Sequence, residues 1–432
     1  KNRDVAFNIF YMGINIGAMF APSAAGAVYN FMLKGKGYFY NADIPALAHK
    51  VLDGKGAEVV DGISYADKLK ELAAAQGFTG ANLSDFANSY VDALSASYHL
   101  AFGVACASLI LSMIVFWVFK KYYKHADMTE KEKAQSEEHK HTVVEMGAAE
   151  VKQRLVALFL VFFVVMFFWM SFHQNGATMT YFARDYTVGS VDKFTNLWFD
   201  LFGLLPIFLA IIGLFFALRK SSSSKTRMIG GISFVVFAIL GYLRYSTYGE
   251  SNPFTPEKFQ HFNPFFIVAL TPIIVGLFGY LAKKGKEPSA PKKIGIGMVI
   301  TSSAFVLLAI GSLKLMGYSP GEIGEVRAPQ NVLVSPYWLI STYFILTIAE
   351  LFISPMGISF VSKVSPPQYK GLMQGGWLAA TAVGNYGVAI VALFWNDLPL
   401  WAFWTVLTVL CLLSAAFIFA VLKTLEKSTD GH

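Results

Sequence analysis

The sequence predicts an all-α protein, a polytopic transmembrane helical bundle with about ten spans, and its composition and its apolar segments carry this prediction. Only 15% of the 432 residues are charged, 55% are hydrophobic, and the mean hydropathy is +0.49. A soluble domain carries about a quarter charged residues. The apolar residues gather in runs of about twenty, and a helix of that length crosses a hydrocarbon core of roughly 30 Å.

The apolar runs give the individual spans, and none shows the short alternating pattern of a barrel strand. The span that contains Pro355 and Gly357 is expected to kink or break there, because proline removes a backbone donor. We expect spans at about 5–33, 98–119, 155–175, 196–218, 228–245, 264–282, 294–313, 336–362, 372–395 and 400–422.

The distribution of Lys and Arg predicts the orientation of the chain. A cytoplasmic N-terminus places 23 of the 35 basic residues inside, and an excess of Lys and Arg marks cytoplasmic loops. The short loops RKSSSSKTR and KKGKEPSAPKK then face in, whereas WNDLPL faces out. With ten spans, both termini of this sequence are cytoplasmic. The net charge of +7 is therefore explained by inner loops, and we expect no nucleic-acid partner.

Two long polar segments divide the chain. Residues 34–96 include the helical stretches SYADKLKELAAAQ and NLSDFANSYVDAL, so we expect a small extracytoplasmic cap. Residues 121–152 carry mixed charge and three His, which favours a solvated cytoplasmic linker over a metal site. The expected parts are 1–120 with the cap, the linker, and a second bundle at 153–432.

Glu350 is the sharpest functional candidate, because an ionisable group inside a span is costly. It lies about fourteen residues into its span, at a depth of ~20 Å by helical rise. Ser354 lies on the same face one turn later. Desolvation disfavours a carboxylate there, which suits a group that takes up and releases a proton. The alternative is a structural carboxyl that a neighbouring helix holds by hydrogen bonds.

Other polar side chains in the spans allow two interpretations each. His173 ends its span and is either an interfacial residue or a titrating group. Asn15 lies among small residues and either joins two helices or binds a ligand. Asn263 precedes Pro264, so it caps a helix or binds a ligand. Trp377 is flanked by glycines that leave room beside its ring.

The chemistry-bearing patterns of enzymes are missing from this sequence. No Gly-rich phosphate loop, catalytic triad or zinc signature stands at a supporting position. We therefore expect no enzyme, no metal and no cofactor other than a coupling proton. Asp200, near the start of its span, is expected to snorkel to the membrane interface or to pair there.

Four motifs, in order, resemble the proton-dependent oligopeptide transporter (POT) family. FNIFYMGINIGAM, residues 7–19, resembles that family's fifth-helix signature, and FWMSFHQNGATMTYF resembles the end of the seventh helix. HFNPFFIVALTPIIVGLF resembles the eighth, and ELFISPMGISFVSKVSPPQYKGLMQGGWLAATAVGNY resembles the tenth and eleventh. Together they cover most of the chain.

The resemblance implies a major-facilitator fold and proton-coupled symport of di- and tripeptides across the bacterial inner membrane by alternating access. It implies that Glu350 meets the peptide's amino terminus, that Asn15 and Asn263 bind the peptide near that end, and that Trp377 lines a side-chain pocket. Ser354 would shape the same surface. Proton coupling would run through Glu350 and His173. We expect peptide and lipid bilayer as partners, and a monomer.

Three departures from the family pattern matter. The first four helices and their Glu-x-x-Glu-Arg motif are not in this sequence, so we expect an N-terminal truncation and a missing carboxylate-binding side. His173 stands where the family usually has an acid before Gln174. Two additional spans, 196–218 and 228–245, follow the seventh helix. A family relative that carries nitrate or another small solute, or a peptide sensor without transport, remains the alternative.

Overall fold

The computed structural model describes residues 2–41, 43–60, 63–123, 146–316, 332–395 and 397–427. In this part of the chain ten helices are long and apolar enough to cross a membrane, which confirms the all-α bundle expected from the apolar runs. They are α1 (Asn2–Gly35), α4 (Leu83–Val118), α7 (Ala148–Phe172), α10 (Leu201–Leu218), α11 (Ser224–Ser246), α12 (Phe262–Lys283), α13 (Ala290–Ser312), α14 (Tyr337–Val364), α15 (Lys370–Leu393) and α16 (Leu400–Ala420).

Shorter elements lie in the connections and at the C-terminal end. The helices are α2 (Asp43–Leu52), α3 (Tyr65–Ala75), α5 (Lys120–Tyr123), α8 (Thr178–Tyr186), α9 (Lys193–Phe199) and α17 (Leu422–Lys427). The 3₁₀ turns are η2 (His173–Gly176), η3 (Pro256–His261), η4 (Leu313–Leu315) and η5 (Pro367–Tyr369). Two antiparallel two-stranded ladders pair β1 (Val59–Val60) with β2 (Ile63–Ser64), and β3 (Ser190–Val191) with β4 (Asn252–Pro253). The three His of the expected linker lie outside the described residues.

The helix α4 is longer than the predicted span at 98–119. It begins at Leu83, so the stretch NLSDFANSYVDAL is the outer part of a transmembrane helix and not a separate cap helix. The side chain of Asn82 caps it by accepting the backbone N–H of Ser84 at 3.1 Å. Since no Gly or Pro occurs between Leu83 and Gly103, nothing local interrupts the helix after that cap.

The helix α14 runs without a break from Tyr337 to Val364, with Pro355 inside it. This excludes a break at Pro355, whereas the other expected outcome, a kink, stays a prediction. Pro355 removes one backbone donor, but Ser354, Met356 and Gly357 around it are all buried. Packing of neighbouring helices on every side holds such a helix together despite the lost bond.

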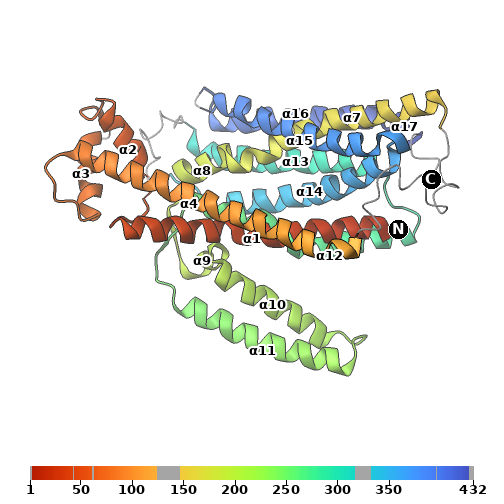
Figure 1. Ribbon diagram of the computed structural model, residues 1–432, viewed down its shortest axis with the longest axis horizontal. Coiled ribbons are helices and arrows are strands. Elements are labelled where there is room, and N and C mark those ends of the chain that lie inside the picture. The colour runs from red at the N-terminus through yellow and green to blue at the C-terminus, as the bar shows by residue number, and fades with distance from the viewer. Residues whose placement is uncertain are drawn as a thin grey trace.

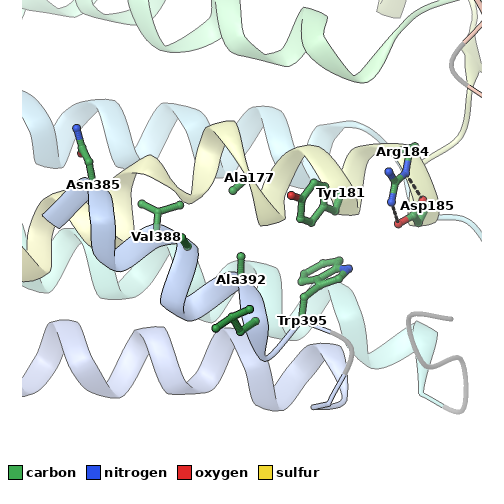
Figure 2. A pocket seen from close by; sticks show the side chains of 10 residues that line it. Ala177, Tyr181, Arg184, Asp185, Asn385, Val388, Ala392 and Trp395 are labelled. Atoms are coloured by element: carbon green, nitrogen blue, oxygen red, sulfur yellow. Dashed lines mark hydrogen bonds and ion pairs between the residues drawn. The ribbon is translucent and has the colours of Figure 1, made fainter. Parts of the chain in front are cut away.

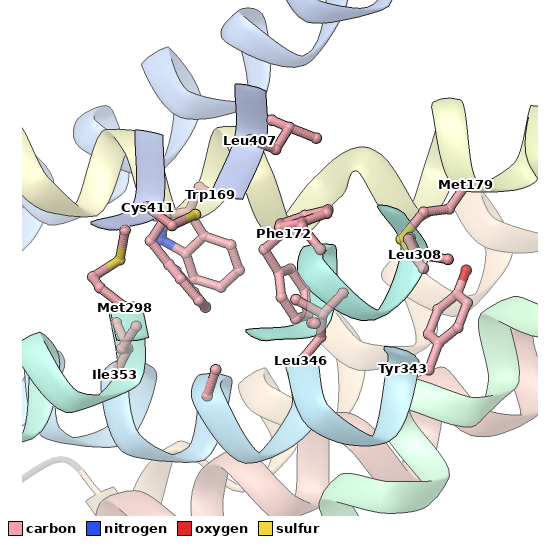
Figure 3. Packing of buried hydrophobic residues seen from close by; sticks show 14 of the residues in the cluster. Trp169, Phe172, Met179, Met298, Leu308, Tyr343, Leu346, Ile353, Leu407 and Cys411 are labelled. Atoms are coloured by element: carbon pink, nitrogen blue, oxygen red, sulfur yellow. The ribbon is translucent and has the colours of Figure 1, made fainter. Parts of the chain in front are cut away.

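The C-terminal helices form the core of the molecule. In the most apolar window of α14, 72% of the residues are buried, whereas none is buried in that of α4. The helix α13 packs against both α14 and α16, and α7 packs against α15 and α16. Together α7, α13, α14 and α16 carry most of the main hydrophobic cluster (Figures 1 and 3). A Cβ on Gly297 of α13 would lie 2.5 Å from Ile353 of α14, so glycine permits this close approach. α14 is therefore central and α4 peripheral, with its apolar side chains left for lipid.

The helix α1 crosses the front of this core and packs against α4, α12 and α14. At one end, α2 and α3 lie beside the outer part of α4 (Figure 1) and share a separate hydrophobic cluster with it. The hydroxyl of Tyr40 donates to Glu257 of η3 at 3.3 Å. Burial and the nearby Glu257 carboxylate raise the pKa of the Tyr40 phenol, which keeps it a neutral donor.

The helices α10 and α11 form a hairpin that extends away from the bundle (Figure 1). A Cβ on Gly213 would lie 2.8 Å from the carbonyl oxygen of Gly230, so the two helices cross in close contact. Asp200 ties its base together. It caps α10 through the N–H of Phe202 and accepts from Arg244 Nε at 2.5 Å and the Tyr248 hydroxyl at 2.8 Å. Asp200 is thus paired at the base of the hairpin, and burial together with that carboxylate raises the pKa of Tyr248.

Candidate functional site

The carboxyl group of Glu350 lies inside the protein and not against the surrounding lipid. Its residue is 3% exposed, near the middle of α14. No ion pair between described residues includes it. The Glu350 carboxyl is therefore a buried acid without a counter-charge. Burial disfavours its ionised form, whereas the donors that bond its oxygens favour that form.

Two side chains from other helices bond the two oxygens of Glu350. Asn263 Nδ2 on α12 donates to Oε2 at 2.6 Å. The hydroxyl of Tyr11 on α1 donates to Oε1. Three helices that are far apart in the sequence thus meet at one carboxyl group, and each oxygen has a donor.

A second hydrogen bond fixes the carboxamide of Asn263. Its Nδ2 also donates to Thr347 Oγ1 at 3.1 Å, and that hydroxyl donates to the carbonyl oxygen of Tyr343 at 2.7 Å. Thr347 lies three residues before Glu350 on α14, so the two lie on one face. Asn263 is inside α12, which begins at Phe262, and its side chain bonds α14. The Asn263 carboxamide therefore bonds α14 instead of capping α12, and its role in ligand binding stays a prediction.

Asn15 and Ser354 lie one step from the carboxyl group. Asn15 is 7% exposed, and its Nδ2 donates to the backbone carbonyl of Tyr11 at 2.9 Å, one turn earlier on α1. Its amide therefore supports the turn that carries Tyr11. Ser354 is 1% exposed, and its Oγ has no hydrogen-bond partner among the described residues. A buried hydroxyl without a partner, one turn from Glu350, is available to a ligand.

Trp377 reaches the same helix from α15. It is 4% exposed, and its ring lies over Gly357, where an added Cβ would come within 2.0 Å of Cη2. Gly357 is two turns after Glu350 on α14. The Trp377 ring therefore packs on α14. The hydrogen bonds and ring contacts of the described residues include none between Trp377 and Glu350.

His173 belongs to a different group of side chains. Its Nδ1 lies 2.5 Å from Oδ1 of Asn385 on α15, and its ring stacks on Trp169 with centroids 4.9 Å apart. It stands where α7 ends and the 3₁₀ turn η2 begins. The structure thus places His173 with Asn385, and the bonds that the Glu350 group makes do not include it.

A cavity of about 520 Å³ begins beside this second group (Figure 2). It lies between α8 and α15, with Tyr181, Arg184 and Asp185 on one side and Asn385, Ala389 and Ala392 on the other. Arg184 and Asp185 form an ion pair at one end, with Nε 2.6 Å from Oδ1. Among the described residues no group of three or more His, Cys, Asp or Glu is placed to hold a metal ion.

Sequence reasoning missed Tyr11, Thr347 and Asn385. Helical spacing could have indicated the first two, since Tyr11 is four residues before Asn15 and Thr347 three before Glu350. Asn385 carried no such signal, because its partner His173 is 212 residues away in the sequence. Only the packing of α15 on α7 brings those two together.

Comparisons with known proteins come from sequence and structure. The sequence model of the POT family matches residues 200–402. The chain is 22% identical over 399 residues to the "Uncharacterized transporter YclF" of Bacillus subtilis, covering 92% of this chain and 62% of that protein. It is 22% identical over 408 residues to the "Peptide transporter YePEPT" of Yersinia enterocolitica, covering 90% and 61%.

A shorter segment is closer to a permease. Over 139 residues the chain is 32% identical to "Dipeptide and tripeptide permease A" of Erwinia pyrifoliae, covering 32% of this chain and 24% of that protein. A crystal structure of a "peptide transporter POT in complex with sulfate" superposes with a TM-score of 0.50 at 17% identity, covering 100% of this chain and 70% of that one. This likeness supports the major-facilitator fold alone. The chain spans about three fifths of the two relatives that it matches along its length.

Proposed function

We propose that this chain, a member of the POT family, takes part in proton-coupled symport of di- and tripeptides across the bacterial inner membrane. The observation that carries the proposal is the buried Glu350 carboxyl, which neutral side chains of α1 and α12 hold at the meeting point of three helices. No cation in the described structure neutralises this carboxyl group, so a coupling proton is suited to neutralise it.

Glu350 is the group that receives the peptide's amino terminus. An ammonium group donates three hydrogen bonds and carries the positive counter-charge that the buried carboxylate lacks. The Asn263 carboxamide, already bonded to Oε2, and the Asn15 carboxamide one turn from Tyr11 then bond the peptide near that end. The buried Ser354 hydroxyl supplies a further polar contact.

Proton and peptide amine compete for the same carboxyl oxygens. The Asn263 amide nitrogen only donates, so Oε2 stays an acceptor and an added proton is placed on Oε1. The protonated Oε1 then donates, and the Tyr11 hydroxyl accepts instead of donating. Because Tyr11 is on α1 and Glu350 on α14, that change acts on the contact between the N-terminal and C-terminal helices. Binding that differs between two arrangements shifts the equilibrium between them, which is the requirement of alternating access.

Trp377 borders the region where a peptide side chain would lie. Its ring offers a large apolar surface over α14 and the glycine at 357 leaves the room for it. An apolar surface of this kind tolerates varied side chains, whereas the polar groups around Glu350 would select the backbone terminus. The proposal therefore includes short peptides of varied sequence as the substrate class, with a monomer in the bilayer as the transporting unit.

The test is peptide uptake by the protein reconstituted into proteoliposomes. We expect Glu350→Gln to lose dipeptide accumulation driven by a proton gradient while dipeptide exchange is retained, since the amide keeps the volume and loses the titrating proton. Glu250→Gln is the matched control, because the Glu250 side chain is 92% exposed and its ion pair among the described residues is with Lys193 at the surface. Accumulation that Glu350→Gln leaves unchanged would show that this carboxyl does not couple proton to peptide.

The same preparation separates the alternative substrates. Excess unlabelled dipeptide should suppress uptake, and excess nitrate should not. Nitrate has no amine to occupy the Glu350 oxygens and would be repelled by the ionised carboxylate. Peptide binding without any flux would instead identify a sensor.

A further inference from the structure

The cavity between α8 and α15 joins the outer end of the bundle to the neighbourhood of His173. Both helices run outward in the orientation set by the inner Lys and Arg, so Arg184 and Asp185 lie near the extracytoplasmic end. Figure 2 shows this pair at one end of the cavity and Asn385 at the other, with Ala177 and Ala392 between them. The side chain that ends the cavity is the one that bonds His173.

The bond between Asn385 and His173 defines the state of the imidazole ring. An amide oxygen only accepts hydrogen bonds, so with Oδ1 facing the ring His173 Nδ1 carries the hydrogen and donates it. Nε2 is then the nitrogen with a free lone pair. Trp169, stacked on the ring with its plane tilted by only 17°, restricts its rotation. The imidazole is thus fixed in one tautomer with one site left for a proton.

The polarity of this face argues for water in the cavity. Asn385 is exposed although it lies within a transmembrane helix, and a carboxamide facing acyl chains is costly. Tyr181, Arg184 and Asp185 supply further hydrogen-bonding groups along the wall. The volume is ample for several water molecules. Their polar partners lie toward the two ends, and apolar side chains line the stretch between them. The Asn385 face is therefore suited to an aqueous path and not to lipid.

We propose that this cavity is the aqueous route by which protons pass between the extracytoplasmic medium and His173, and that Asn385 is the positioning residue that sets the ring's proton affinity. The proposal rests on the proposed function and adds to it the entry path and the residue that controls it. His173 Nε2 takes a proton from hydronium, which leaves water, and the reverse step returns it. Nδ1 keeps its hydrogen bonded to Asn385 throughout.

The charged and titratable groups that line the cavity come from α8. Tyr181, Arg184 and Asp185 line the cavity, and Arg184 and Asp185 neutralise each other in an ion pair. On α15 the nearest titratable group is Tyr386, which is 74% exposed. The ring contacts of His173 on its own side are with the uncharged Trp169 and Phe172. Asn385 is therefore the neighbour whose charge state a substitution can change most directly.

Cysteine labelling tests the route independently of transport. Ala389→Cys and Ala392→Cys, in a Cys106→Ser background, are treated in intact vesicles with a membrane-impermeant thiol reagent added outside. Ile390→Cys is the matched control, because Ile390 neighbours Ala389 on the same helix and is 50% exposed but does not line the cavity. We expect both cavity cysteines to react at least about tenfold faster than the control, since the reactive thiolate needs water. Equal rates would overturn the route whether or not the protein transports peptide.

The pH profile of uptake tests the role of Asn385. Asn385→Asp places a carboxylate beside the ring, which favours the imidazolium form, and should move the midpoint of the profile to higher pH by about one unit. Asn385→Leu removes the hydrogen bond and should move the midpoint to lower pH. A merely structural role would lower the rate in both variants without opposite shifts. His173→Gln should abolish the difference between them, and shifts that persist in its presence would overturn the assignment.

Discussion

Gly357→Ala is the substitution for which the structure gives the clearest magnitude. The new Cβ would lie 2.0 Å from Cη2, 2.5 Å from Cζ3 and 2.8 Å from Cζ2 of Trp377. Ordinary van der Waals contact begins at 3.4 Å. The ring must therefore retreat by about 1.4 Å, or α14 and α15 must separate by a similar distance.

Either movement costs free energy, because Trp377 is 4% exposed and its surroundings are packed. Overpacking of a close-packed site costs about 1–3 kcal/mol, and a tenfold change in an equilibrium is about 1.4 kcal/mol. We expect Gly357→Ala to lower the free energy of unfolding by about 1–3 kcal/mol. Uptake of dipeptides with bulky side chains should lose about tenfold in affinity while dialanine changes less, because the indole borders the side-chain region.

The measurements are thermal unfolding in detergent, followed by tryptophan fluorescence, and competition of bulky and small dipeptides for uptake. Gly276→Ala on α12 and Gly375→Ala on α15 are matched controls, since an added Cβ would meet nothing within 4 Å at either position. Both controls should be neutral or stabilising, as alanine replaces glycine inside a helix. If Gly357→Ala behaves like these two, the assigned contact between Trp377 and α14 is not the one that positions the ring.

Two further predictions concern the polar contacts between helices. Tyr11→Phe removes one donor to Glu350, a bond to an ionisable group worth about 1.5–3 kcal/mol, so proton-driven uptake should fall by tenfold or more while binding of labelled peptide persists. Equal loss of binding and uptake would show that Tyr11 serves the site and not the coupling. Asp200→Ala leaves Arg244 and Tyr248 without their acceptor and removes the cap of α10. Limited proteolysis of the α10–α11 hairpin should become faster, and an unchanged cleavage rate would refute its anchoring role.

The number and order of the transmembrane helices could be predicted from the sequence, because each span depends on a local run of apolar residues. The ends of the helices were predicted less accurately. The outer part of α4 was read as a cap helix, since polar residues outside the hydrocarbon lose the apolar signal while the helix itself continues from the Asn82 cap. Of the kink or break expected at Pro355, the break does not occur, because proline indicates a lost local hydrogen bond but not the buried neighbours that compensate for it.

In the candidate site, too, local sequence indicated some residues but not their partners on other helices. Glu350 and Asn263 were each recognisable as polar residues in apolar surroundings, and the structure joins them directly. Their common partners were not recognisable, because the bond between Tyr11 and Glu350 joins residues 339 positions apart. His173 was a candidate for proton coupling from the sequence, and its assignment stays a prediction. The polar residues that meet across helices are fixed by packing, which a single sequence does not display.

The two bonds to Glu350 differ in what they connect, and this difference bears on coupling. Asn263 and Glu350 both belong to the C-terminal helices, and Thr347 holds the Asn263 amide on the same face of α14. That bond lies within one packed unit and is kept when the unit moves as a whole. The Tyr11 bond instead joins α1 to α14 and must change if α1 moves relative to the core. In the proposed function, a proton or a peptide amine on Glu350 would therefore act on movement through Tyr11, while Asn263 would keep the carboxyl group in place for either ligand.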